Sequence, residues 1–305
     1  MEVADARFVT QEEVLAQRPR RASGLRFAGL WVSGSLAGLS ARTVAIVGCR
    51  APSEGGRSRA RELGQALAQA GVCVISGLAL GVDGASHAGA LAGGGPTIGI
   101  LGGGHRHFFP ARNASLARAM LAGGGAVLSP FEPDEPARPW QFLQRNSVVA
   151  ALSDAVVVVE AAARSGALNT AGWAADLGIE VLAFPGDVDR PKAAGCNALI
   201  RDGAVLVRHA EDVLGVLGIA SAAPRAVLPA RRFDDPLEAA LVKALSDQAC
   251  DLDLLCDLGR AAAGETLAAL VRLEIAGAVE RSDAGSWKVR SSPAPKARRG
   301  SPPDR

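Results

Sequence analysis

The sequence predicts an α/β protein with a mostly parallel sheet, followed by a second, smaller domain. Two observations lead to this fold class. Between residues 41 and 217, short apolar runs alternate with segments of helical periodicity, which is the pattern of βαβ units with right-handed crossovers. Beyond a stretch rich in Pro and Ala, the pattern changes to three short helices and a hairpin.

The elements of the first domain follow in chain order. Residues 1–40 are weakly patterned and are predicted to be a short N-terminal extension, with a short edge strand at 30–36. Apolar runs predict seven strands at 44–48, 72–77, 97–103, 126–129, 155–161, 180–186 and 204–207. Helical periodicity predicts helices at 54–70, 83–92, 113–122, 140–151, 168–177, 195–202 and 210–217.

The C-terminal part has the pattern of a winged-helix domain. Residues 218–232 (GIASAAPRAVLPARR) are predicted to be a linker. The domain is expected at 233–290, with helices at 236–245, 252–259 and 265–277 and a hairpin at 278–290 that turns at Asp283-Ala284-Gly285. Residues 291–305 (SSPAPKARRGSPPDR) are predicted to be a disordered basic tail.

Composition limits the classes of protein to consider. No apolar run reaches the ~18 residues of a membrane span, and the N-terminus has no signal-peptide pattern. The five cysteines are odd in number and form no C-x-x-C motif, which predicts reduced thiols in a cytoplasmic protein. We therefore expect no membrane contact.

Charge is distributed unevenly along the chain. Residues 41–215 hold 15 basic and 15 acidic side chains, whereas residues 232–290 hold 7 basic and 11 acidic ones. The formal net charge of the whole chain is only +2. Any binding of nucleic acid must therefore come from a local cluster of cations.

Small and polar residues follow nearly every predicted strand. The stretch TVAIVGCR ends in Gly48-Cys49-Arg50, and other strands end in Ser76-Gly77 and Gly102-Gly103-Gly104. Ligands of open parallel sheets bind beyond the carboxyl ends of the strands, where glycine amides can point at an anion. The alternative is that these glycines serve only tight turns. Neither the dinucleotide motif G-x-G-x-x-G nor a P-loop G-K-[ST] is present.

Several longer motifs occur in a fixed order. They are VAIVGCRAPSEGG (44–56), SGLALGVDGASHAGAL (76–91), LGGGHRHFFPARNASL (101–116), WQFLQRNSVVAALS (140–153), EAAARSGALNTAG (160–172) and AFPG…GCNALIRDGA (183–204). In order and spacing, residues 25–217 resemble the DprA/Smf family of DNA-processing proteins, with a weaker similarity in the winged-helix region. The resemblance implies an extended Rossmann-like fold that binds single-stranded DNA. It also implies a homodimer that protects incoming DNA and loads RecA in natural transformation and homologous recombination, without a cofactor and without catalysis.

The sequence departs from the family pattern at six positions. Cys49 stands for Ser, Gly55 for Tyr, Arg106 for Asp, Leu143 for Pro, Ser147 for Arg and Asn169 for Ile. We expect the loss of an arginine at position 147 to weaken DNA binding. Forty residues leave no room for the N-terminal helical domain of many members, so no role of that domain is carried over.

The predicted site combines the strand ends with the family motifs. Arg50 and Arg145 are expected to contact phosphate, because a guanidinium gives a bidentate fork for phosphate oxygens. Phe142 is expected to stack on a base. The full set of predicted DNA- or phosphate-binding residues is Gly48, Arg50, Ser53, Gly56, Ser76, Gly77, Gly81, Gly102, Gly103, Gly104, Phe142, Arg145, Asn146, Ser165, Gly166 and Thr170.

Two other kinds of site involve neighbouring residues. Asp83 and His87, with Ser76 or Ser86, suggest a hydrolase triad, but Asp and His four apart on one helix more often tie a turn. His105 and His107 are too few ligands for a metal site.

Two alternatives to DNA binding concern the whole chain. A nucleotide-processing enzyme of the Rossmann-like phosphoribohydrolase type requires P-G-G-x-G-T-x-x-E, whereas this chain has SGALNTAGWAAD. A nucleotide-sensing regulator would use the winged helix to bind DNA. However, the predicted recognition helix, 265–277, carries Arg272 against Glu265 and Glu274, which favours a protein-contact or structural role.

Overall fold

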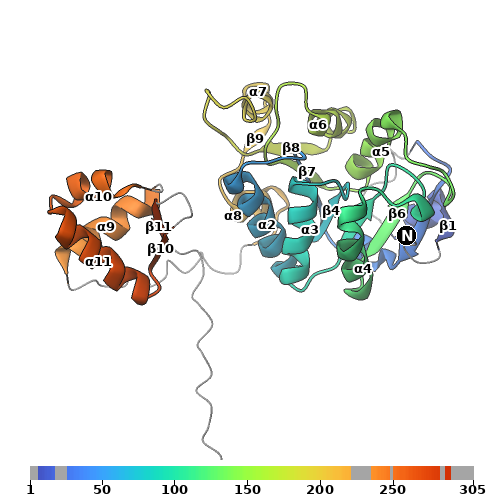
Figure 1. Cartoon of the computed structure of the whole chain (residues 1–305). Coiled ribbons are helices and arrows are strands. Elements are labelled where there is room, and N and C mark those ends of the chain that lie inside the picture. Colours follow the sequence, from blue (N-terminus) through green and yellow to red (C-terminus); the bar gives the residue numbers. More distant parts are fainter. Residues whose placement is uncertain (1–5, 18–25, 221–234, 248–249, 282–285, 290–305) are drawn as a thin grey trace, which may run out of the picture. The chain divides into compact units, whose positions relative to one another are not determined.

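The computed structural model describes residues 6–17, 26–220, 235–247, 250–281 and 286–289. The chain divides into two compact units, residues 1–222 and 223–305 (Figure 1). The predicted tail at 291–305, most of the predicted linker and the predicted hairpin turn lie outside the described residues. The predicted domain bounds therefore stay a prediction.

The first unit is built on a nine-stranded sheet in the order β1-β2-β6-β5-β4-β3-β7-β8-β9. Every pair from β6 to β9 is parallel, and β1 and β2 are antiparallel to their neighbours. The strands are β1 (Arg7–Thr10), β2 (Gly29–Gly34), β3 (Thr43–Val47), β4 (Cys73–Ser76), β5 (Thr97–Ile100), β6 (Ala126–Ser129), β7 (Ala155–Val158), β8 (Glu180–Ala183) and β9 (Val205–Leu206). The predicted α/β class with a mostly parallel sheet is confirmed.

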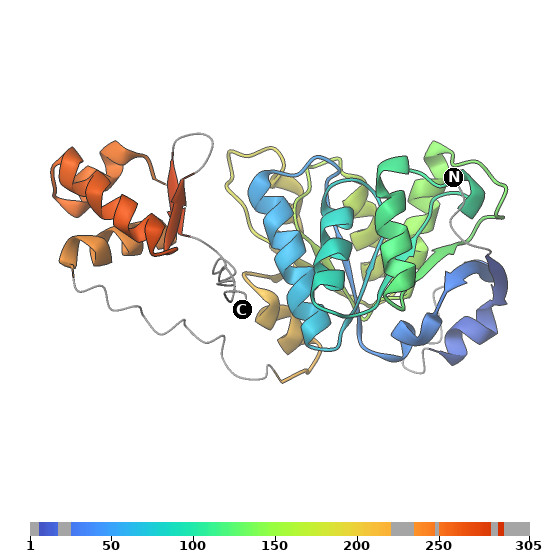
Figure 2. The same ribbon diagram turned by 60° about the horizontal axis from the view of Figure 1, so that its bottom comes forward.

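Helices cover both faces of this sheet (Figure 2). They are α1 (Gln11–Ala16), α2 (Glu54–Gln69), α3 (Val82–Ala92), α4 (Ala114–Ala122), α5 (Pro139–Ala151), α6 (Gly166–Asp176), α7 (Ala194–Arg201) and α8 (Ala210–Val216). Alternate residues of a strand point to opposite faces. In β3, Ala45 and Val47 join the core beneath α5 and α6, while Val44 and Ile46 join the core beneath α2 and α3. Two-sided burial explains why the central strands are apolar throughout.

The N-terminal segment extends the sheet. β1 pairs with β2, and α1 follows at once, capped by a reciprocal pair of hydrogen bonds between Thr10 and Glu13. The prediction that residues 30–36 form an edge strand is therefore wrong. They correspond to β2, which is the second strand from the edge, because β1 pairs on its outer side.

The second unit has the winged-helix arrangement that the sequence predicts. It consists of α9 (Pro236–Asp247), α10 (Leu252–Gly259), α11 (Ala263–Ile275) and an antiparallel pair, β10 (Val279–Arg281) and β11 (Trp287–Val289). Leu241, Leu255, Leu270 and Trp287 are buried in its core. Among the residues described in both units, no helix is both long enough and apolar enough to cross a membrane.

Candidate functional site

The carboxyl ends of the parallel strands lie at one edge of the sheet, and α5 brings two predicted residues to it. Pro139 occupies the first turn of α5, where its fixed backbone suits a helix start. Phe142 and Arg145 are three residues apart and share one face of this helix. This places an aromatic ring and a guanidinium together at the ends of β4 and β5.

Arg145 is buried, with 4% of its surface exposed. Its Nη1 donates to the carbonyl oxygens of Gly77, at 2.6 Å, and of Ile100, and its Nε donates to Asn146 at 3.3 Å. Burial lowers the pKa of Arg145 to about 10, so the guanidinium stays charged at neutral pH. Arg145 therefore fastens the ends of β4 and β5 to α5.

Asp83 is the buried carboxylate beside Arg145. It accepts hydrogen bonds from the amides of Gly77, at 3.0 Å, and Ala79, at 3.3 Å. Burial raises the pKa of Asp83, while the charge of Arg145 and the two amides act in the opposite direction. The prediction that Asp83 ties a turn is confirmed.

His87 lies one turn further along α3, in the core. Its Nδ1 lies 2.7 Å from Thr97 Oγ1, which donates in turn to the Val74 carbonyl, so the ring donates through Nδ1. Burial lowers the pKa of His87 to about 3, and the ring is neutral at physiological pH. A hydrolase triad would need Ser76 or Ser86 to donate to this ring. Instead, Ser76 donates to the Ile46 carbonyl and Ser86 donates to the Asp83 carbonyl.

A cluster of one cation and two aromatic rings forms around the half-buried Phe142, three residues before Arg145 on α5. The Arg50 guanidinium carbon is 5.3 Å from the centroid of the Phe142 ring, and Arg50 itself is exposed. Phe109 meets Phe142 edge to face, with ring centroids 5.9 Å apart, and is 54% exposed. We call Arg50, Phe109 and Phe142 the Arg50–Phe142 cluster. It offers the charge of Arg50 and the ring of Phe109 to solvent, with Phe142 half-buried between them.

Gly102 sets the position of the Phe142 ring. A Cβ at residue 102 would lie 2.5 Å from a carbon of that ring, so only glycine lets the ring pack this closely on the end of β5. Sequence reasoning selected Phe142 but missed Phe109. The signal for Phe109 is its place in the loop that follows β5, next to Pro110.

The first turn after β3 is organised differently from the prediction. Ser53 caps α2 by accepting from the Gly56 amide at 3.0 Å, and its own amide donates to a Glu160 carboxylate oxygen at 2.9 Å. A Cβ at Gly56 would lie 2.0 Å from the same oxygen. Glu160 thus occupies the place where a helix N-terminus would hold a phosphate. This corrects the expectation that Ser53 and Gly56 face a phosphate.

Several other predicted donors are also used inside the fold. The Gly77 amide donates to Asp83, the Gly104 amide donates to the Glu135 carbonyl, and Ser76 is fully buried. Gly102 and Gly103 are buried as well, against Phe142 and Ala137. The Gly77 and Gly104 amides and the Ser76 hydroxyl are therefore used inside the fold, and a phosphate contact at the remaining glycines stays a prediction.

The remaining predicted residues lie near Arg50 or at the start of α6. Gly48 and Gly81 are half-buried beside Arg50, and Gly81 has a positive φ of 84° that brings its backbone against the carbonyl of Arg50. At the start of α6, the Asn146 side chain donates to the Gly166 carbonyl and to Asn169, both at 3.2 Å. Ser165 caps α6, and Thr170 is buried. Asn146 therefore positions the start of α6.

One exposed cation beside the cluster was not predicted. Lys192, in the loop between β8 and α7, donates from Nζ to the Ala51 carbonyl at 2.6 Å. It follows that Lys192 lies next to the loop that carries Arg50.

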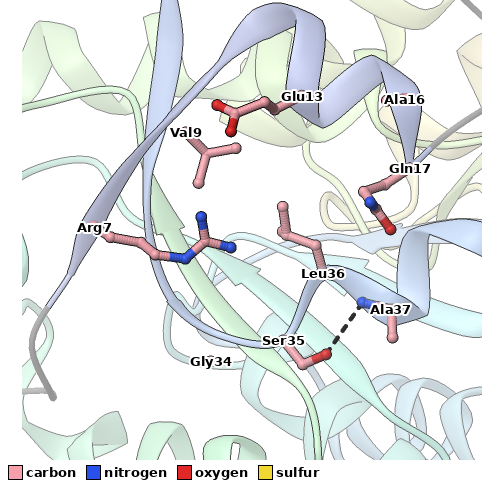
Figure 3. A pocket seen from close by; sticks show the side chains of 9 residues that line it. All are labelled: Arg7, Val9, Glu13, Ala16, Gln17, Gly34, Ser35, Leu36 and Ala37. Carbon is pink, nitrogen blue, oxygen red and sulfur yellow. Dashed lines mark hydrogen bonds between the residues drawn. The ribbon is translucent and has the colours of Figure 1, made fainter.

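A separate cavity of about 530 Å³ lies at the opposite edge of the sheet (Figure 3). Gly34, which lines it, pairs with Ala126 at the amino end of β6. The Arg7 guanidinium points into the cavity, and Glu13 lies on its rim, where the amide and hydroxyl of Thr10 lower the pKa of the Glu13 carboxyl. None of the predicted site residues lines it.

The chain matches known families over both units. Residues 26–218 match the family described as DNA recombination-mediator protein A, and residues 221–285 match the DprA winged helix domain. Protein Smf of Escherichia coli strain K12 is 35% identical over 267 residues, covering 86% of this chain and 71% of the relative.

Two solved structures share the fold. The X-ray structure of DNA processing protein A from Streptococcus pneumoniae is 32% identical, with a TM-score of 0.61, over 70% of this chain and 75% of that chain. DNA processing protein A from Helicobacter pylori is 25% identical, with a TM-score of 0.60, over 71% of this chain and 98% of that chain. The Helicobacter pylori structure concerns the single-stranded DNA binding mode of that protein.

Proposed function

The chain belongs to the DNA recombination-mediator protein A family, and we propose on this premise that it binds single-stranded DNA at the Arg50–Phe142 cluster. The single observation that carries the proposal is the exposed Arg50 guanidinium above the Phe142 ring, with Phe109 edge-on beside it. A guanidinium binds phosphate, and a ring face stacks on a base.

The chemistry of the cluster favours a single strand over a duplex. A side-chain ring can stack on the face of a base in a single strand, whereas a duplex holds its bases paired and stacked on one another. A base stacked on an aromatic side chain contributes roughly 1–3 kcal/mol. Every base has such a face, so we expect little sequence preference. The similarity to a relative with a single-stranded DNA binding mode supports the same conclusion.

The buried residues have a positioning role in this proposal. Arg145 has its donors on Gly77, Ile100 and Asn146, and it holds the helix that carries Phe142. Direct contact of Arg145 with phosphate stays a prediction. Lys192, beside the Arg50 loop, is the candidate for a second phosphate contact.

The wider role follows from the family. We propose that the protein, as a homodimer, protects incoming single strands and loads RecA onto them in natural transformation and homologous recombination. The description of the family as a recombination mediator supports this role. The site would act by binding, since the Ser and His side chains near it are used within the core.

The test is a fluorescence-anisotropy titration with a labelled single strand and with a duplex of the same sequence. We expect the single strand to bind more tightly, and Arg50→Ala to weaken that binding by about tenfold. Arg201→Ala is the matched control, because Arg201 is an exposed arginine at the end of α7, which leads to the amino end of β9. Equal binding of strand and duplex, or equal losses in the two variants, would overturn the proposal.

A further inference from the structure

An apolar stripe runs along the exposed side of α11. Leu267, Val271 and Ile275 are spaced four residues apart and are 43%, 42% and 84% exposed. This spacing places them in one row on the helix surface. The core of the unit is held by a different face of α11, which buries Leu270 and Leu273. The stripe therefore leaves apolar surface that its own unit does not cover.

The neighbouring helix also exposes apolar side chains. On α10, which packs against α11 (Figure 1), Leu254 and Leu258 are four residues apart and are 37% and 52% exposed. Single exposed leucines are ordinary, whereas two rows on adjacent helices suggest an interaction surface. We call these five residues, Leu254, Leu258, Leu267, Val271 and Ile275, the α10–α11 stripe.

The charges beside the stripe are mostly acidic, and the exposed Arg260 at the C-terminal end of α10 is the exception. Asp253 and Asp257 are exposed on α10 and flank its two leucines, and Glu274 precedes Ile275 on α11. The only cation within α11, Arg272, is held by Glu238 at 2.6 Å and by Asp235 at 2.8 Å. A surface of this kind repels phosphate, in contrast to the basic recognition helix of DNA-binding winged helices.

We propose that the α10–α11 stripe is the docking surface for a cationic amphipathic helix of a partner protein. Such a helix would place apolar anchors at positions i, i+4 and i+8 against the stripe. Its lysines or arginines would face Asp253, Asp257 and Glu274. A second copy of this chain is a poorer occupant, because self-pairing would bring the same acids together.

The test uses two synthetic helical peptides of about five turns with the same leucine stripe, one flanked by lysines and the other by glutamates. Anisotropy titrations against the full chain should show binding of the lysine peptide and about tenfold weaker binding, or none, of the glutamate peptide. Val271→Asp and Ile275→Asp should each weaken the binding of the lysine peptide by about tenfold. A purely electrostatic attraction would instead be strengthened by the added carboxylates.

The controls keep this proposal separate from DNA binding. Ala262→Asp adds the same charge at the exposed N-terminus of α11 and should leave peptide binding unchanged. Arg50→Ala should also leave it unchanged, and Ile275→Asp should leave single-stranded DNA binding unchanged. Because Ile275 is 84% exposed, its variant should unfold at the same temperature as the wild type.

Four results of the binding experiments would overturn the proposal, and a fifth comes from sedimentation. They are failure of the lysine peptide to bind, equal binding of the two peptides, binding that neither stripe variant weakens, and loss of duplex DNA binding in those variants. Sedimentation that shows Ile275→Asp converting a dimer to a monomer would also overturn it, because a second copy would then cover the stripe.

Discussion

At the scale of single residues, Arg145 and Arg50 show how two arginines at one sheet edge differ in role. The Arg145 donors are satisfied inside the fold, on two carbonyl oxygens and Asn146. A buried charge is tolerated only when it is paired and hydrogen-bonded. Arg50 is exposed and lies over a ring. The structure therefore favours Arg50 as the ligand and Arg145 as the group that positions Phe142.

The buried ring of His87 leads to a prediction about pH. Its pKa is lowered from 6.5 to about 3 in the folded chain, so the unfolded chain binds a proton that the folded chain does not between these values. The free energy of unfolding should therefore fall as pH falls from about 6.5, by up to roughly 1.4 kcal/mol per pH unit from this group. Above about pH 6.5, His87 adds no pH dependence to the free energy of unfolding.

Denaturant titrations from pH 7 to pH 4 would check this, using His87→Asn with wild type as reference. The variant should be less stable at neutral pH but should lose less stability on acidification. His107→Asn, which changes an exposed ring, is the control and should follow the wild type. Parallel pH profiles for wild type and His87→Asn would contradict the assignment.

The sequence could predict which residues of the site come together, but less well what each of them does. Apolar runs followed by small residues correctly placed Arg50, Gly77 and Gly102 at one edge. The pattern could not show that Glu160, from a distant strand, would occupy the N-terminus of α2. This contact joins residues that are 107 positions apart in the chain.

At the scale of elements, the helices of the second unit differ in how they begin. Asp251 caps α10 by accepting from the Leu254 amide at 2.9 Å. α11 begins after Ala262, which has an extended backbone and cannot cap the helix with its side chain. The start of α11 therefore lacks a stabilising interaction that α10 has.

Replacing Ala262 with serine should supply this cap. The backbone of Ala262 already has the extended conformation that a capping residue requires, so we expect a gain of about 0.5–2 kcal/mol. Hydrogen exchange at the amides of α11 would measure it, and Asp251→Ala should lower the protection of α10 by a similar amount. Unchanged protection in Ala262→Ser would show that the cap is not limiting.

Among the elements, the central strands and the helices between them were predictable from periodicity. β1 was not, because a four-residue strand with one buried side chain gives almost no alternation. Its partner β2 is predictable as a strand, but a pattern that does not reveal β1 makes β2 the edge of the sheet. Short strands at the margin of a sheet depend on pairing rather than on their own pattern.

At the scale of the whole molecule, charge separates the two units. The first domain is balanced, with 15 basic and 15 acidic residues over 41–215, whereas residues 232–290 carry a net charge of −4, from 7 basic and 11 acidic side chains. Nucleic acid should therefore bind the first unit, through a few local cations. The acidic second unit is better suited to a protein partner.

This distribution predicts a modest dependence on salt. If two or three phosphates are neutralised, the logarithm of the association constant should fall with the logarithm of salt concentration at a slope of about −1.4 to −2.1. Removing Arg50 should make the slope shallower by about 0.7. Anisotropy titrations at several salt concentrations would measure both values. A much steeper slope that Arg50→Ala leaves unchanged would indicate that DNA binds elsewhere.

The most direct test of the Arg50–Phe142 cluster is to locate bound DNA by photocrosslinking. A single strand that carries a photoreactive thymine analogue would be crosslinked to the full chain, and the attached peptides identified by mass spectrometry. The account predicts crosslinks to Phe142 or Phe109, which Arg50→Ala should reduce. Crosslinks confined to α11 or to residues 291–305 would contradict it, because single-stranded DNA would then bind outside the sheet edge.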